Sequence, residues 1–315
     1  MTSSFCKFHS FLLILFFSLS SSSSNIFTIT NNCPYTIWPG TLSGSGSPPL
    51  TTTGFQLNSG QKAKLTSVPG WSGRIWGRTG CNFDATGIGK CLTGDCGGRL
   101  ECDGTGAAPP TSLFEITLGQ GNTQDFYDVS MVDGYNLPIL AVPRGVYGDR
   151  ACNATGCVYD LNRGCPRELQ VVGGEGGNEG GVVACKSACE AFGSDRYCCS
   201  GEFANPNTCQ PTYYSTIFKR ACPRAYSYAF DDGTSTFTCR ATEYDIVFCP
   251  YSNRMKRPNN FVSPPPPYYQ IEQPTTGKAV KDMASTSSSS ILSPFSVPVF
   301  IFMFISLINF LSINI

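Results

Sequence analysis

Histidine is almost absent from this chain, and its absence excludes several kinds of catalysis. The single histidine among 315 residues is His9, close to the N-terminus. Ser-His-Asp and Cys-His nucleophilic mechanisms use an imidazole as the general base. Zinc sites with histidine ligands need the same side chain. Chemistry in the body of the chain must therefore depend on carboxylates, and we predict no metal site.

Charge is also scarce. Asp, Glu, Lys and Arg make up 14% of the sequence, and the formal net charge is zero. Residues 25–251 carry 16 basic and 20 acidic side chains, which is a slight acidic excess. A nucleic-acid-binding domain needs a basic face. The composition therefore argues against a nucleic-acid partner, and we predict no cofactor and a monomeric protein.

The first 24 residues predict a secretory signal peptide. Lys7 and His9 form a weakly cationic start, the apolar run Phe11–Leu19 follows, and serines continue to Ser24. Cationic, apolar and small residues in this order are typical of a cleaved leader. The apolar run is too short to cross a bilayer of about 30 Å. We expect cleavage near Ser24 and secretion of the remainder.

The C-terminal part lacks charge altogether after Asp282. Residues 285–315 begin with small residues and end in the apolar stretch Phe295–Ile315. Small residues, a spacer and an apolar tail form the attachment signal for a glycosylphosphatidylinositol (GPI) anchor. A true membrane span usually carries Lys or Arg on its cytoplasmic side. We predict a GPI-attachment signal at 285–315, with a transmembrane segment at 295–315 as the alternative. Either would hold the protein at the outer face of the plasma membrane, against the cell wall.

Cysteine, in contrast, is abundant. The chain has 17 cysteines, and removal of Cys6 with the leader leaves an even number. In an oxidising compartment these favour eight disulfides. A zinc site at Cys91, Cys96 and Cys102 is disfavoured, because secreted thiols oxidise and the spacing forms no paired CxxC knuckles. With every thiol paired, no cysteine nucleophile remains.

The cysteines also delimit the domains. All those left after cleavage lie within 25–251, which we predict to be the folded domain. Residues 252–284 contain the run Pro264–Pro267 and little apolar sequence. Proline-rich segments of this kind form extended spacers. We predict a Pro/Ser-rich stalk between the folded domain and the anchor signal.

The folded domain is predicted to be mainly β. Apolar and polar residues alternate in short runs punctuated by glycine and proline, which favours an antiparallel β-sandwich. The predicted strands are Ile26–Thr30, Tyr35–Trp38, Leu113–Leu118 and Phe126–Val132. The predicted helices are Ala184–Phe192 and Tyr213–Ala221, and the glycine-rich run Gly173–Gly181 is predicted to be a surface loop.

Several motifs place these features in a known family. Gly87–Cys102 reads GIGKCLTGDCGGRLEC, and it is accompanied by NNCPYTIWPG at Asn31–Gly40, GRIWGRTGC at Gly73–Cys81 and CPRAYSYAFDD at Cys222–Asp232. The segment from Asn25 to about Tyr251 resembles the thaumatin-like proteins, a pathogenesis-related family of plants. The resemblance implies an antiparallel β-sandwich, a disulfide-rich and partly helical second lobe, and a small cysteine loop.

The resemblance also implies which cysteines pair, which the sequence alone leaves open. The implied pairs are Cys33–Cys249, Cys81–Cys91, Cys96–Cys102, Cys152–Cys239, Cys157–Cys222, Cys165–Cys185, Cys189–Cys198 and Cys199–Cys209.

An acidic cleft between the sandwich and the second lobe is a further implication. Its residues here would be Arg74, Glu115, Asp128, Asp133 and Asp231, and a shift of one position would exchange Asp231 for Asp232. Residues five apart face opposite sides of an unbroken strand, so Asp128 and Asp133 share a cleft only if the chain bends near Val132–Gly134.

Two carboxylates in such a cleft could hydrolyse a glycosidic bond. One of them must then stay protonated, and Glu115, between Phe114 and Ile116, is the side chain that we predict to have the raised pKa. Asp128 or Asp133 would be the second group. A cleft that only binds would use the same groups to hydrogen-bond sugar hydroxyls.

Three functions follow as hypotheses. The leading one is a cell-surface, wall-associated defence protein that binds β-glucan and is antifungal, with at most weak hydrolysis. The second is an endo-β-1,3-glucanase, and the third is a structural or signalling module without catalysis. The sequence Asn153-Ala154-Thr155 is an acceptor site for N-glycosylation, so Asn153 is a candidate for modification.

Overall fold

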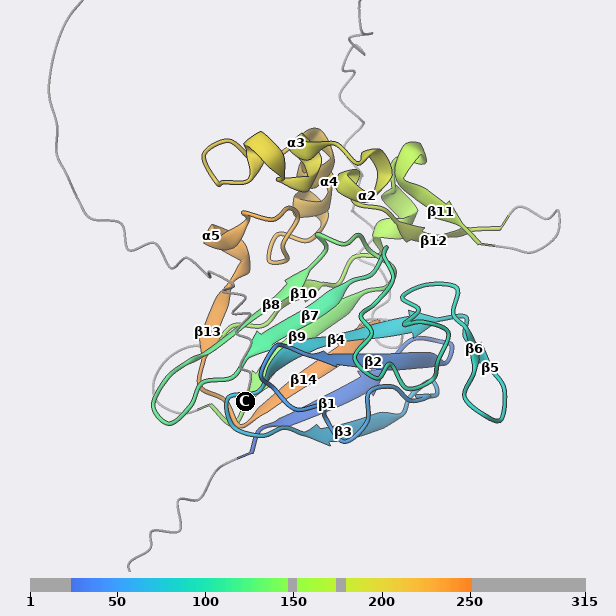
Figure 1. Ribbon diagram of the computed structural model, residues 1–315, viewed down its shortest axis with the longest axis vertical. Coiled ribbons are helices and arrows are strands. Elements are labelled where there is room, and N and C mark those ends of the chain that lie inside the picture. Colours follow the sequence, from blue (N-terminus) through green and yellow to red (C-terminus); the bar gives the residue numbers. More distant parts are fainter. Residues whose placement is uncertain (1–23, 147–151, 174–179, 251–315) are drawn as a thin grey trace, which may run out of the picture. The chain divides into compact units, whose positions relative to one another are not determined.

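Two five-stranded sheets form the larger lobe (Figure 1). The computed structural model describes residues 24–146, 152–173 and 180–250. One sheet has the strand order β10-β9-β14-β1-β3, and the other has the order β13-β8-β7-β4-β2. Helices and two short hairpins make up the rest. The prediction of a mainly β fold is confirmed.

The elements have the following bounds. The first sheet contains β1 (Ile26–Asn31), β3 (Lys62–Thr66), β9 (Ile139–Arg144), β10 (Thr155–Cys157) and β14 (Glu243–Phe248). The second contains β2 (Ile37–Ser43), β4 (Ser72–Thr79), β7 (Leu113–Thr117), β8 (Asp125–Ser130) and β13 (Phe237–Cys239). The hairpins are β5 (Asn82–Phe83) with β6 (Gly89–Lys90), and β11 (Gln170–Val172) with β12 (Val182–Cys185). The α-helices are α2 (Ala188–Phe192), α3 (Asp195–Cys198), α4 (Tyr213–Ala221) and α5 (Asp232–Ser235). Three 3₁₀ turns are η1 (Leu161–Gly164), η2 (Arg167–Leu169) and η3 (Gly201–Phe203).

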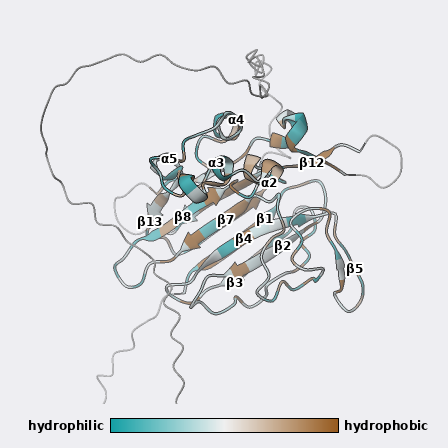
Figure 2. Cartoon of the chain, turned by 45° about the horizontal axis from the view of Figure 1, so that its top comes forward, coloured by the Kyte–Doolittle hydropathy of each residue, from teal (hydrophilic) through white to brown (hydrophobic). Residues whose placement is uncertain are grey.

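Alternating side chains explain how the second sheet has a core face and a pocket face. Phe114 of β7 and Tyr127 of β8 are buried between the two sheets. The Phe114 ring lies 6.2 Å from that of Tyr244 on β14, which belongs to the other sheet. Glu115 and Asp128, one position along their strands, must then point to the opposite face. Figure 2 shows both hydrophilic and hydrophobic residues on β7 and β8.

One pairing in the sandwich departs from the predicted antiparallel arrangement. Strands β1 and β14, the first and the last of the chain, pair in parallel, from Ile26 opposite Glu243 to Asn31 opposite Phe248. Just beyond the end of both strands, Cys33 is bonded to Cys249. Periodicity within each strand cannot reveal this pairing, because the two strands are joined only by the whole intervening domain.

The second lobe is partly helical, as predicted, but one helix is shorter than expected. The predicted helix from Ala184 begins instead at Ala188, because Val182–Cys185 pairs as strand β12 with β11. Ser187 then caps the helix, since its Oγ accepts a hydrogen bond from Glu190 N at 3.1 Å. The predicted helix Tyr213–Ala221 is confirmed as α4 and carries a capping box at Thr212.

The small cysteine loop, residues 81–108, is held to the sandwich by Arg78 of β4. This side chain is fully buried. Its guanidinium donates to the carbonyl oxygens of Trp38, Pro39, Arg99 and Leu100 at 2.7–3.2 Å. Burial lowers its pKa to about 10, so the group remains charged at neutral pH. One arginine therefore joins strand β2 to the loop through backbone acceptors.

All the cysteines of the described part are in disulfides. They form the same eight pairs that the resemblance implies, from Cys33–Cys249 to Cys199–Cys209. The predicted leader, the centre of the glycine-rich run, the stalk and the anchor signal lie outside the described residues. Within 24–146, 152–173 and 180–250, no helix combines the length and apolar character needed to cross a bilayer.

Candidate functional site

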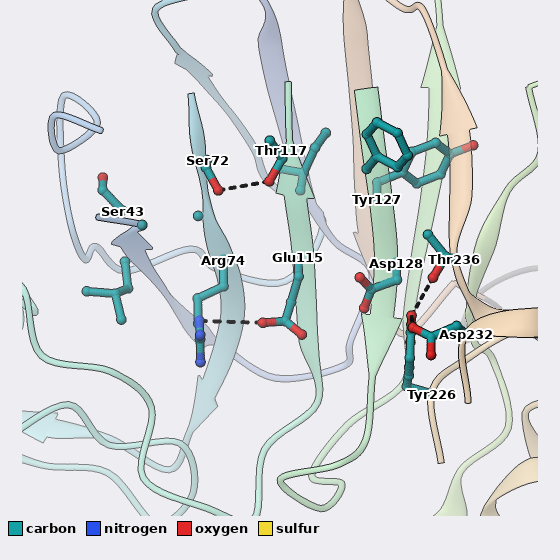
Figure 3. Close-up of a pocket in the computed structure, with 15 residues that line it drawn as sticks. Ser43, Ser72, Arg74, Glu115, Thr117, Tyr127, Asp128, Tyr226, Asp232 and Thr236 are labelled. Carbon is teal, nitrogen blue, oxygen red and sulfur yellow. Dashed lines mark hydrogen bonds and ion pairs between the residues drawn. The ribbon is translucent and has the colours of Figure 1, made fainter. Parts of the chain in front are cut away.

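A pocket of about 480 Å³ lies on the face of the second sheet that points away from the sandwich core. Strands β2, β4, β7 and β8 supply its floor, and residues just before β13 close one end. Its charged and hydroxyl-bearing lining residues include Arg74, Glu115, Asp128, Tyr226, Asp232 and Thr236 (Figure 3). The pocket brings three of the five predicted cleft residues together, namely Arg74, Glu115 and Asp128.

Three of the predicted residues form a row across neighbouring strands. Arg74 of β4 is opposite Glu115 of β7, and Glu115 is opposite Asp128 of β8. Residues directly opposite each other in a sheet have Cβ atoms about 4.5–5.5 Å apart and point to the same face. Figure 3 shows this order, with Arg74 Nε 3.6 Å from Glu115 Oε1. The strand register alone therefore places one guanidinium and two carboxyl groups side by side.

Asp128 is the carboxyl group with the most strongly perturbed environment. Burial raises its pKa to about 8, the negative charges of Glu115 and Asp232 act in the same direction, and Arg74 opposes them. Its Oδ1 is buried and has no hydrogen-bond partner among the described residues. A carboxyl in such surroundings holds its proton at neutral pH.

Glu115 differs because it has the counter-ion. Burial raises its pKa as well, but the adjacent Arg74 lowers it, and the charge of Asp133 raises it. The net pKa of Glu115 is raised, in the direction predicted, and that of Asp128 is raised more strongly, to about 8. Asp128 is the better proton holder, since it is one strand further from the guanidinium.

The second lobe contributes a tyrosine to the pocket wall. The backbone of Tyr226 runs beside β8, with its N–H donating to Val129 O at 2.8 Å and its carbonyl accepting from Met131 N at 3.0 Å. Burial raises the pKa of Tyr226, and its hydroxyl donates to Asp232 Oδ1 at 2.7 Å. The same hydroxyl also bonds Thr236 Oγ1. The pairing with β8 thus fixes a phenol and a carboxylate opposite Asp128.

Asp231 was predicted in this position, and the structure places Asp232 there instead. The Asp231 carboxylate lies 2.9 Å from Lys219 Nζ and accepts hydrogen bonds from the N–H and hydroxyl of Ser227. It is therefore held inside the second lobe and does not line the pocket. Asp232, the first residue of α5, is the one that faces the floor.

Asp133 lies beyond the lining of the pocket, although its charge acts on Glu115. The chain does bend where the prediction required it. Gly134 N donates to Met131 O at 3.0 Å, and Gly134 has a φ of 85°, which is a conformation that glycine adopts most easily. The bend takes Asp133 past the end of β8, so the row on the floor ends at Asp128.

Sequence reasoning missed the aromatic part of the site. Phe126 lines the pocket, and 53% of its surface is exposed. Its signal was present, because Phe126 is two residues before Asp128 on a strand and therefore shares its face. Tyr226 has no such signal, since only the folding of the second lobe brings it to β8.

Two further predictions concern positions outside the pocket. Asn153 is exposed, and Thr155 of the same acceptor sequence is fully buried, with its hydroxyl donating to Arg224 O at 2.7 Å. Glycosylation of Asn153 stays a prediction. Among the described residues, no group of three or more His, Cys, Asp or Glu side chains is placed to hold a metal ion.

Comparison with known proteins places the chain clearly. Residues 31–250 match the model of the thaumatin family. Pathogenesis-related protein 5 of Arabidopsis thaliana is 56% identical over 224 residues, covering 71% of this chain and 90% of that protein. Pathogenesis-related thaumatin-like protein 3.5 of Cryptomeria japonica is 52% identical over 240 residues, covering 76% of this chain and 96% of the relative. Among solved structures, the thaumatin-like xylanase inhibitor TLXI is 24% identical with a TM-score of 0.39, covering 71% of this chain and 99% of the inhibitor.

Proposed function

The chain belongs to the thaumatin family, and on that basis we propose that it is an extracellular defence protein that binds β-1,3-glucan chains in its acidic pocket. The observation that carries the proposal is the row of Arg74, Glu115 and Asp128 on the pocket floor beside the exposed ring of Phe126. The names of its relatives, which are pathogenesis-related proteins, support the defence role.

The row suits a neutral sugar because it offers hydrogen-bond donors and acceptors together. Each sugar hydroxyl both donates and accepts. Glu115 is an acceptor, Arg74 is a donor, and a protonated Asp128 supplies one of each. A pocket of several ionised acids would instead favour a cation. The raised pKa of Asp128 thus reduces the negative charge of the floor and favours an uncharged polyhydroxylated ligand.

Phe126 completes the site with an apolar surface. Its ring is on the same face of β8 as Asp128 and is 53% exposed. A large aromatic side chain left exposed in a pocket wall is the kind of group that stacks against an apolar ligand face. A pyranose ring has such a face, with its hydroxyls around the edge. Stacking on Phe126 would direct those hydroxyls toward the row.

The test is the binding of soluble β-1,3-glucan to the mature protein, measured by isothermal titration calorimetry. Phe126→Ala should weaken binding by about tenfold or more, as expected for an aromatic contact in a pocket. Tyr213→Ala is the matched control, since Tyr213 is also exposed, at 52%, but lies on α4 outside the pocket. Equal affinities of the two variants and the wild type would contradict the proposal.

Hydrolysis is a second candidate function, favoured by one observation. Glu115 and Asp128 are direct neighbours across β7 and β8. Opposed residues in a sheet approach the separation of about 5–5.5 Å that is found between the carboxyl groups of retaining glycosidases. Asp128 would then act as the acid and Glu115 as the nucleophile. The assay is the release of reducing ends from the same glucan, with turnover falling as pH rises through about 8 and absent in Asp128→Asn.

We also propose that the protein is secreted and stays on the outer surface of the membrane through a lipid anchor. The proposal is supported by the apolar leader and by the charge-free segment after Asp282. Phosphatidylinositol-specific phospholipase should release the protein from membranes. Peptides from Phe300–Phe310 in the mature protein would show a retained transmembrane segment instead.

A further inference from the structure

We propose that the glucan-binding pocket continues past strand β2 into a second pocket, and that one extended glucan chain occupies both. The second pocket measures about 550 Å³ and lies between residues 47–53 and the turn at Glu101–Gly104. Leu42 and Ser43, at the end of β2, line both pockets. The inference rests on the proposed function, and it adds that the site selects for chain length.

The row of charged residues on the pocket floor points toward the second pocket. The row Asp128, Glu115, Arg74 runs across β8, β7 and β4, and the next strand is β2, at the edge of the sheet. Figure 3 shows Ser43 beyond Arg74, at the end opposite Asp128 and Tyr226. Neighbouring strands are about 4.8 Å apart, so three strand steps from β8 to β2 span about 14 Å. The second pocket begins where this span ends.

Hydroxyl-bearing residues predominate in the second pocket, and Pro49 and Leu50 add apolar surface. This mixture again suits a sugar ring with apolar faces and hydroxyl edges. Both pockets therefore offer hydrogen-bonding groups next to apolar surface.

The two acidic residues of the second pocket, Glu101 and Asp103, have different roles. The Glu101 carboxylate accepts hydrogen bonds from the N–H and hydroxyl of Thr53, the hydroxyl of Thr52 and the N–H of Gly54, at 2.7–3.0 Å. Those bonds hold the 52–54 loop. Burial alone would raise the pKa of Glu101, but the same hydrogen bonds outweigh this effect and lower the pKa. Glu101 is thus a structural residue of the wall.

Asp103 differs from Glu101 because its carboxylate makes almost no hydrogen bonds with the described residues. Within the described residues, its carboxylate receives one long hydrogen bond, from Thr53 Oγ1 at 3.4 Å. The residue has a φ of 44°, so its turn holds it in the left-handed region. Asp and Asn tolerate this conformation better than most side chains. The carboxylate at the rim is free to accept a hydrogen bond from a sugar hydroxyl.

The experiment compares short and long ligands. Binding of the β-1,3-linked glucose disaccharide and hexasaccharide to the mature protein is measured by calorimetry. The hexasaccharide should bind about tenfold or more tightly than the disaccharide, because it adds several hydrogen bonds in the second pocket. Thr51 is an exposed, hydroxyl-bearing residue of the second pocket. The variant Thr51→Ala with Asp103→Gly should lose most of this gain and leave the disaccharide affinity unchanged. Glycine at 103 adopts the positive φ without strain.

Glu202→Ala is the charge-matched control, because Glu202 is exposed on η3 in the second lobe. It should keep the full gain. A hexasaccharide that binds the wild type no more tightly than the disaccharide would overturn the inference, as would a gain that survives in the double variant. If the disaccharide still binds in either case, the proposed function is not contradicted. Failure of both ligands to bind would overturn the proposed function and the inference together.

Discussion

Asp128 and Glu115 face each other across β7 and β8, and two ionised carboxyl groups are costly to keep side by side in a partly buried pocket. This cost is reduced because the guanidinium of Arg74 is adjacent to only one of the two groups. Arg74 lies 3.6 Å from Glu115 and favours its ionised form, whereas the pKa of Asp128 is raised to about 8. The pKa values of both groups are raised, and the guanidinium opposes the rise most at Glu115, its direct neighbour.

The stability of the protein should depend on pH through Asp128. An aspartate in an unfolded chain has a pKa of about 3.9, whereas that of Asp128 in the fold is about 8. A raised pKa means that the folded state binds the proton more tightly. This contribution to the free energy of unfolding is complete below about pH 4 and is lost as pH rises to about 8.

Asp128→Asn removes this dependence, because the amide does not ionise. The variant should be more stable than the wild type at pH 8 by about 1–3 kcal/mol, and the difference should shrink toward pH 4. Guanidinium denaturation at pH 4, 6 and 8 with the disulfides intact measures it. Parallel pH profiles for the two proteins would show that Asp128 is already ionised in the fold.

At the level of single residues, only part of the site could be predicted from the sequence. Arg74, Glu115 and Asp128 were found from their motifs, and the strand register places them together. The choice between Asp231 and Asp232 could not be made. It depends on which carboxylate Lys219 binds, and Lys219 is on a different helix.

A single strand can supply both a pocket residue and a residue that anchors another part of the fold, and β4 is the clearest case. On its pocket side it presents Arg74, and at its other end Arg78 holds the cysteine loop through backbone carbonyls. Buried carbonyl groups that lose their donors each cost about 1–3 kcal/mol. The attachment of the loop therefore depends on the guanidinium as well as on the two disulfides Cys81–Cys91 and Cys96–Cys102.

Arg78→Lys should destabilise the protein by about 3 kcal/mol or more, because one ammonium cannot replace the planar fork of donors. Cleavage within residues 84–106 by a protease should also accelerate. Arg99→Lys is the matched control in the same loop, since the Arg99 side chain is exposed, and it should have little effect. Guanidinium denaturation and limited proteolysis provide the two measurements. Equal stability of both variants would contradict the role of Arg78.

At the level of elements, the alternating runs were predicted well and the exceptions have physical causes. Strands β7 and β8 lie within one or two residues of their predicted bounds. The segment from Ala184 lacks glycine and proline, which predicts a helix, yet pairing with β11 makes its first two residues part of a strand. Pairing with a strand outside the segment leaves no mark on the local periodicity of the segment itself.

The whole domain is closed by one covalent bond between its ends. The Cys33–Cys249 bridge spans 216 residues and adjoins the parallel pair β1–β14, whereas Cys96–Cys102 spans six. Chain entropy gives up to about 5 kcal/mol for a loop of the first length and about 2 kcal/mol for the second. The other bridges inside the long loop shorten it and reduce the larger figure.

Replacing Cys33 and Cys249 by serine should therefore destabilise the protein more than replacing Cys96 and Cys102. We expect a difference of about 1–3 kcal/mol in the free energy of unfolding. Guanidinium denaturation of the two double variants measures it, and quantification of free thiols confirms that the remaining bridges are intact. A larger loss on removing the short bridge would show that the ends of the domain are held by β1–β14 pairing alone.

If the carboxyl groups that line the pocket bind glucan, a titration of a variant without these groups should show it. Soluble β-1,3-glucan is titrated into the mature wild type and into the variant Glu115→Gln, Asp128→Asn, Asp232→Asn, with circular dichroism to establish that both are folded. Each amide keeps one acceptor oxygen but loses the negative charge that strengthens the hydrogen bonds to Glu115 and Asp232, so binding should weaken by about tenfold or more. Undiminished glucan affinity in the folded triple variant would contradict the account.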